Sequence, residues 1–142
     1  MAYVFPKAQI RKLNLYTHSS DTELILNPEN SGSVILLDNS TNNLEIRLPG
    51  VQYNAGLNFT FLVINTANSK TIKIHSKTNK GVFETKIKRA GTDGTEVNTL
   101  IITSHGSSSE MGDKVEAICN GTNWFLNVVG GESETSSTYS TE

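Results

Sequence analysis

The 142-residue sequence contains one cysteine, and none of its apolar runs approaches the length of a membrane span. The lone Cys119 cannot form a disulfide within the chain, and no CxxC pair indicates a zinc site. Because a membrane helix needs roughly 20 apolar residues, no membrane partner is expected. The N-terminus lacks a basic stretch followed by an apolar one, so it does not resemble a secretory signal. Synthesis in a reducing cytoplasm is therefore expected.

Charge of either sign is also scarce. Charged residues make up 18% of the chain and the net charge is −2, which gives no overall field to attract nucleic acid. The chain is nevertheless too apolar, and too weakly charged, to be disordered throughout. Its length is that of a single domain with enough buried surface to fold without disulfides or metal.

Helix-forming patterns are missing, and strand patterns take their place. Ser, Thr and Asn together account for about a third of the residues, and these side chains compete with helix through local hydrogen bonds. Segments such as Leu44–Leu48 alternate apolar and polar residues until Pro49-Gly50 ends them. Residues 11–129 hold about ten such short segments between turn residues, which is typical of an antiparallel β-sandwich. Because no short internal repeat is visible, a solenoid is not expected.

The ends of the chain differ in composition from its middle. We predict an N-terminal arm at residues 1–12, a β-sandwich domain at residues 13–130, and a polar acidic tail at residues 131–142 that is typical of a mobile end. Asn120-Gly121 predicts a type I′ turn joining the last two strands of the domain. Five large apolar side chains on alternating positions are expected in the core: Phe59, Phe61, Ile72, Ile74 and Trp124.

Catalytic patterns are absent. His18, His75 and His105 are far apart and match no metal-binding spacing, so solvent-facing side chains are expected. The less favoured alternative is a metal held by one histidine from each chain at a trimer axis. Gly91–Glu96 lacks the acidic ligands of a calcium loop, and Cys119 alternates with apolar residues, so it is expected in the core. The sequence thus predicts no enzyme, no cofactor and no resident metal.

Basic residues are concentrated in one part of the sequence. Either they protect exposed edge strands from aggregation, or they form a patch that docks to an acidic surface or to another copy. The stretch has no interleaved aromatic residues that would stack on nucleic acid. It contains Lys70, Lys73, Lys77, Lys80, Lys86, Lys88 and Arg89.

An ordered series of four segments resembles a known module. The segments are Leu44–Gly50, Ala55–Phe61, Thr71–Ile74 and Gly112–Phe125, which ends in Gly-Thr-Asn-Trp-Phe. This series is similar to a β-rich module of tailed-bacteriophage structural proteins, found in tail fibres, spikes and capsid-associated proteins. The resemblance covers roughly residues 43–129. The chain departs from the fibre pattern because it has no long repetitive shaft, which favours a free-standing virion component.

The resemblance implies a capsid decoration, or cement, protein. Such a protein would be a homotrimer of jelly-roll-like sandwiches on the virion surface, made in the host cytoplasm and bound to the major capsid protein. The arm would contact the capsid or a neighbouring copy; alternatively, it simply forms the first strand. The arm residues expected to make the contact are Tyr3, Val4, Phe5, Ile10, Arg11 and Lys12.

Two other functions fit parts of the sequence. A receptor-binding or carbohydrate-binding head module of a tail fibre or spike would use exposed aromatic residues, for which Tyr53 and Tyr139 are candidates. A secreted lectin-like sandwich would explain the three Asn-x-Ser/Thr sequons at Asn39, Asn58 and Asn120. The missing signal sequence and the unpaired Cys119 argue against that second possibility.

Overall fold

The computed structural model describes residues 15–67, 69–76, 87–89, 96–103, 112–129 and 138–141. These residues form strands and one 3₁₀ turn at Pro28–Asn30. The strands are β1 (Leu15–His18), β2 (Leu24–Ile25), β3 (Val34–Asn39), β4 (Leu44–Arg47), β5 (Asn58–Thr66), β6 (Thr71–His75), β7 (Ile87–Arg89), β8 (Glu96–Val97), β9 (Thr99–Thr103), β10 (Lys114–Cys119), β11 (Trp124–Val129) and β12 (Thr138–Thr141). The described part of the chain has no helix long and apolar enough to cross a membrane.

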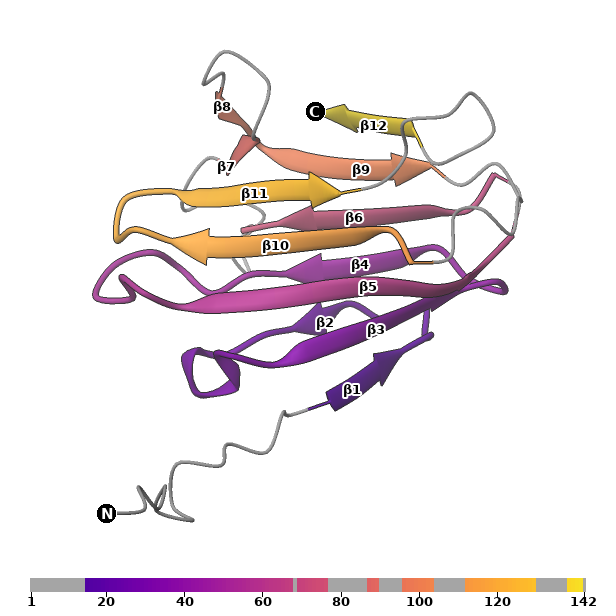
Figure 1. Ribbon diagram of the computed structural model, residues 1–142, viewed down its shortest axis with the longest axis horizontal. Coiled ribbons are helices and arrows are strands. Elements are labelled where there is room, and N and C mark those ends of the chain that lie inside the picture. Colours follow the sequence, from indigo (N-terminus) through magenta and orange to yellow (C-terminus); the bar gives the residue numbers. More distant parts are fainter. Residues whose placement is uncertain are drawn as a thin grey trace, which may run out of the picture.

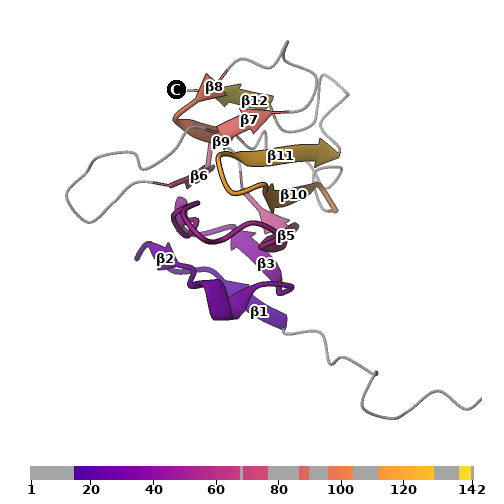
Figure 2. The same cartoon turned by 90° about the vertical axis from the view of Figure 1, so that its left-hand side faces the viewer.

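The strands form two layers. One is a seven-stranded sheet in the order β1-β3-β5-β10-β11-β7-β8, and the other is a five-stranded sheet in the order β12-β9-β6-β4-β2. Figures 1 and 2 show β1 and β2 together at one end of the layers and β8 and β12 at the other. The all-β prediction is confirmed. The arm at residues 1–12 lies outside the described residues, and Thr138–Thr141 of the predicted tail form β12.

Strand direction departs from the antiparallel prediction. The antiparallel pairs are β5–β10, β10–β11, β6–β9, β9–β12 and β7–β8. The pairs β1–β3, β3–β5, β2–β4, β4–β6 and β7–β11 are parallel. The sheets are therefore mixed, which departs from a jelly roll of antiparallel strands. Two parallel neighbours must be joined by a crossover connection. In the first half of the chain, each crossover connection contributes one strand to the opposite sheet.

The first half of the chain winds in coils, because β1 to β6 alternate between the two sheets. Paired residues of successive coils are 19 apart for Leu15 and Val34, and 28 apart for Leu44 and Ile72. Coils of such unequal length leave no constant period in the sequence. This explains why the sequence predicted no solenoid-like winding.

The core lies between the inward faces of the two sheets. Strand residues alternate between the two faces, and along β5 and β6 the inward positions are the aromatic and branched apolar ones. The five side chains expected in the core are all buried: Phe59, Phe61, Ile72, Ile74 and Trp124.

Trp124 connects the core to the loop that follows β4. Its ring lies against Phe59, with centroids 5.8 Å apart and planes tilted by 36°. The indole Nε1–H donates a hydrogen bond of 2.8 Å to the carbonyl oxygen of Pro49. The fully buried indole thus has its polar atom satisfied, as buried tryptophan requires.

The hairpin between β10 and β11 forms, but its predicted turn is wrong. The pair that borders the turn is Cys119 with Trp124, so four residues, Asn120–Asn123, lie between the strands. Gly121 has a positive φ of 92°, whereas Asn120 does not. A type I′ turn needs positive φ at both central positions. The Asn120 side-chain oxygen instead accepts hydrogen bonds from the backbone N–H groups of Thr122 and Asn123, at 2.9 and 2.8 Å. This local capping stabilises a longer loop.

Candidate functional site

A cluster of charged side chains lies on the outer face of the five-stranded sheet. Leu44 and Ile46 of β4 point into the core, so alternation sends Glu45 and Arg47 to the opposite face. The parallel pairing of β4 with β6 sets Arg47 beside His75. Strands β4 and β6, together with the residue that precedes β2, therefore bring together residues 23, 45, 47 and 75.

Contacts within the cluster converge on the ring of His75. Its Nε2 atom lies 2.8 Å from Glu45 Oε1 and 3.1 Å from Glu23 Oε2. The guanidinium of Arg47 forms an ion pair with the other carboxylate oxygen of Glu23. One imidazole nitrogen thus faces two carboxylates, and one of those carboxylates also binds a permanent cation.

The donor set defines what this cluster can do chemically. The imidazole nitrogen and one oxygen from each carboxylate lie within 4.8 Å of one another, close enough to surround one metal ion. Two carboxylates and one imidazole are ligands that several divalent metals accept. The Arg47 cation would compete with a metal ion for the carboxylate of Glu23. Without a metal ion, the same four side chains form a network of polar contacts among themselves.

The structure corrects the expectation that His75 is solvent-facing. The side chain lies on the outer face of β6, yet the residue is only 2% exposed. Burial of a polar ring requires hydrogen-bond partners, and the two carboxylates supply them. The sequence expectation failed because side chains from distant parts of the chain, Glu23 before β2 and Glu45 of β4, lie against the ring.

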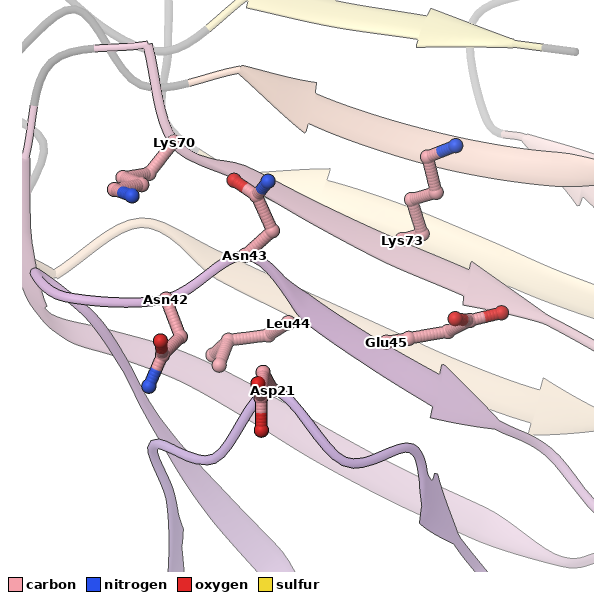
Figure 3. Close-up of a pocket in the computed structure, with 7 residues that line it drawn as sticks. All are labelled: Asp21, Asn42, Asn43, Leu44, Glu45, Lys70 and Lys73. Atoms are coloured by element: carbon pink, nitrogen blue, oxygen red, sulfur yellow. The ribbon is translucent and has the colours of Figure 1, made fainter.

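A polar pocket of about 430 Å³ borders this cluster at the beginning of β4 and β6 (Figure 3). Two lysines and two carboxylates line it, so its formal charges balance. Because Glu45 belongs to both the pocket and the cluster, the two form one continuous surface. The lining residues are Asp21, Asn42, Asn43, Leu44, Glu45, Lys70 and Lys73.

Hydrogen bonds hold the two asparagines of the pocket in place. The Asn42 side-chain amide donates to the carbonyl of Ser19 at 3.0 Å. The side-chain oxygen of Asn43 accepts from the backbone N–H of Thr71 at 2.9 Å. These two hydrogen bonds fix the position of each asparagine relative to the backbone of a neighbouring segment.

His18 also departs from the sequence expectation. It ends β1 with its side chain buried, not in a solvent-facing turn. Within the part of the chain that the structure describes, its Nε2 atom has no hydrogen-bond partner. Desolvation by burial lowers the pKa of His18 below the ordinary value of 6.5, opposed by a hydrogen bond to the backbone of Glu45.

The buried His18 predicts a loss of stability in mild acid. Because the pKa of His18 is lowered in the folded state, the unfolded chain binds more protons than the folded chain at pH values just below 6.5. The free energy of unfolding therefore falls as the pH drops below 6.5, and this fall ends below the folded-state pKa. We expect urea titrations from about pH 7.5 to about pH 5 to show this fall, and His18→Gln to make it shallower. Identical pH dependences of the two proteins would contradict the assignment to His18.

The basic residues of the predicted patch that the structure describes belong to both sheets. Lys70 and Lys73 line the polar pocket of the five-stranded sheet, whereas Lys88 and Arg89 belong to β7 of the other sheet. Lys77, Lys80 and Lys86 lie outside the described residues.

The remaining candidates lie either outside the described residues or away from the pocket. The arm residues Tyr3, Val4, Phe5, Ile10, Arg11 and Lys12 lie outside the described residues, as does His105. Cys119 is buried, as its alternation predicts. Tyr53 is 95% exposed and has a positive φ of 63°, but it follows the end of β4, whereas the polar pocket lies at its beginning. The structure therefore does not bring Tyr53 to the pocket.

Sequence reasoning missed the charged cluster, although a signal for it was present. Glu45 and Arg47 alternate on β4, and Lys73 and His75 alternate on β6, which marks one polar face on each strand. What was missing was the parallel pairing that aligns the two faces, together with the position of Glu23 beside them.

A scan of protein-family models, a search of curated proteins and a search of solved structures each found no match to this chain.

Proposed function

We propose that this protein is a non-enzymatic structural component of a tailed-bacteriophage virion. It binds the outer surface of the capsid as a homotrimer, with the major capsid protein as its partner, and stabilises the shell. The observation that carries the proposal is that the four segments resembling the phage module meet one another in space. These segments contribute β4, β5, β6 and the β10–β11 hairpin.

Contacts between the segments occur at one end of the two layers. The side chain of Trp124, in the last segment, hydrogen-bonds to Pro49 in the first. The backbone N–H of Gly56, in the second, donates to the carbonyl of the last residue of β10 at 2.8 Å. A Cβ atom on Gly121 would lie 3.3 Å from the Cβ of Ala55, tighter than ordinary van der Waals contact. The spacing and glycines of the series thus have a structural reason, which supports reading them as one module.

The outer face of the seven-stranded sheet offers an apolar contact for a partner. Ile118 of β10 and Phe125 of β11 lie directly opposite each other and are 54% and 42% exposed. Large exposed apolar pairs of this kind are typical anchors of protein interfaces. A stable interface needs on the order of 1,000 Å² in all, so neighbouring polar residues would complete the contact.

The test uses capsids of the phage whose genome encodes this chain, prepared without the protein. We expect the purified protein to be a trimer by light scattering, to bind these capsids in fixed stoichiometry, and to raise their thermal disruption temperature. Ile118→Asp with Phe125→Asp is expected to weaken capsid binding at least about tenfold, since a buried charge disrupts an apolar contact.

Tyr53→Asp serves as the matched control, because Tyr53 is an exposed aromatic residue on a loop outside that face. It should leave capsid binding unchanged. Capsids that neither bind the protein nor gain thermal stability would overturn the proposal. If the purified protein is a monomer that still binds the capsids, the homotrimer would be excluded but the proposed capsid binding would stand.

The polar pocket favours a second function, that of a receptor-binding or carbohydrate-binding module. Its carboxylates, amides and ammonium groups are the donors and acceptors that sugar hydroxyls use, and it has the volume of a small-ligand site. A glycan-array experiment with the wild type and Lys70→Ala separates the two functions. Glycan binding that Lys70→Ala weakens, with no effect on capsid stability, would establish the second function in place of the first.

A further inference from the structure

The outer face of the five-stranded sheet places two glutamates next to each other. Leu24 of β2 pairs with Ile46 of β4 in parallel register. The residues one step earlier, Glu23 and Glu45, therefore also lie side by side, with carboxylate oxygens within 4.8 Å of each other. Like charges on directly opposite residues of neighbouring strands destabilise a sheet. A cation between the two carboxylates would remove this repulsion.

His75 of β6 lies against both carboxylates. Its Nε2 atom is 2.8 Å from Glu45 Oε1 and 3.1 Å from Glu23 Oε2. The His75 side chain is only 3% exposed, whereas that of Glu45 is 47% exposed, which gives an ion a path from solvent. An imidazole nitrogen carries at most one hydrogen, so a protonated Nε2 has a single hydrogen for two carboxylates. A metal ion bonds to all three donor atoms at once.

The distances between the donor atoms suit a small divalent ion. Zinc binds imidazole nitrogen and carboxylate oxygen at about 2.0–2.2 Å, so tetrahedral geometry sets two such ligands about 3.3 Å apart. The contact of His75 with Glu23 is already 3.1 Å. The 2.8 Å contact with Glu45 needs to lengthen by about 0.5 Å to reach the same value. Because the Glu45 side chain is half-exposed and flexible, it has room for this adjustment.

Arg47 holds one of the carboxylates without occupying the oxygen that faces His75. Its guanidinium pairs with Oε1 of Glu23, whereas Oε2 of the same carboxylate faces the ring. An ionised carboxylate has about four lone-pair sites on its two oxygens, so it can bind a guanidinium and a metal ion together. Carboxylates that ligate metals are commonly held by such hydrogen bonds. The charge of Arg47 lowers the affinity for a metal ion, but its contact fixes the position of Glu23.

We propose that Glu23, Glu45 and His75 bind a divalent transition-metal ion, and that zinc is the ion this donor set suits best. The imidazole ligand favours zinc over magnesium and calcium, which prefer sites made of oxygen atoms. The three protein ligands leave a fourth position for a water molecule. The sequence predicted no resident metal, because the ligands come from three separate segments and form no local motif.

The ion would fasten the edge of the five-stranded sheet. Strand β2 has only two residues and pairs only with β4 among the described strands. A bond from the ion to Glu23, the residue directly before β2, joins this short strand to β4 and β6. An ion that binds only the folded site stabilises the fold by mass action. This role goes beyond the proposed function and does not depend on it, since the ligands all belong to one chain.

Isothermal titration calorimetry with zinc chloride tests the site in the full chain, after bound metal has been removed with a chelator. We expect one zinc ion per chain and at least about hundredfold weaker binding of magnesium. His75→Gln and Glu45→Gln should each weaken zinc binding at least about tenfold. Asp21→Asn is the matched control, because Asp21 lines the neighbouring pocket but is not one of the three ligands. Wild-type affinity in both ligand variants, or a loss of affinity in Asp21→Asn, would overturn the proposal.

Hydrogen exchange measured by mass spectrometry locates the ion without relying on the affinity. We expect saturating zinc to slow exchange at least about fivefold in the peptide that contains Glu23–Leu26. This slowing should persist in Asp21→Asn and disappear in Glu45→Gln, which replaces a half-exposed side chain and should leave the domain folded. No slowing in the wild type, or the same slowing in Glu45→Gln, would show that the ion does not bind at this site.

Discussion

Trp124→Ala is expected to lower the free energy of unfolding by about 3–5 kcal/mol, the range for removing a large buried aromatic side chain. The substitution leaves a cavity beside Phe59 and removes the donor to the carbonyl of Pro49. Domains are typically stable by only about 5–15 kcal/mol, so a substantial part of the stability would be lost. Urea unfolding followed by circular dichroism measures the effect as a lower midpoint.

Two further substitutions separate the causes. Trp124→Phe keeps an aromatic ring near Phe59 but removes the hydrogen bond, and should cost about 1–3 kcal/mol. Phe125→Ala, on the next residue of the same strand, removes a partly exposed outward ring and should cost less than about 1 kcal/mol. A larger loss for Phe125→Ala than for Trp124→Ala would contradict the packing described for β11.

Arg47→Met is expected to destabilise the protein by about 1–3 kcal/mol at neutral pH, because a partly buried charge that loses its partner costs more than the pair itself contributes. The substitution removes the cation that pairs with Glu23. The two carboxylates beside His75 then lack the positive charge of Arg47. The same urea measurement, made at low salt, gives the magnitude.

A double variant identifies the interaction. Glu23→Gln combined with Arg47→Met removes both charges, and should be more stable than Arg47→Met alone. Lys114→Ala breaks the exposed ion pair with Glu116 and is the matched control, with an expected cost below about 1 kcal/mol. If the double variant is no more stable than Arg47→Met, the charge explanation is wrong.

The candidate site could be predicted only in part. Alternation along β4 and β6 is a local property, so the sequence was sufficient to place Glu45 and Lys73 on polar faces. The burial of His75 depends on Glu23 and Glu45, which are 52 and 30 residues away in sequence. Nothing local to His75 specifies those neighbours.

The sequence alone determined the all-β class, the residues of the core and the existence of the β10–β11 hairpin. These follow from alternating apolar residues, scarce helix formers and turn residues, which act over a few neighbouring positions. Only the tertiary structure decided that half of the strand pairs among the described residues are parallel. Parallel and antiparallel neighbours bury the same alternating faces, so the local pattern does not distinguish them. The direction is set by which sheet each crossover enters, and that choice depends on long-range packing.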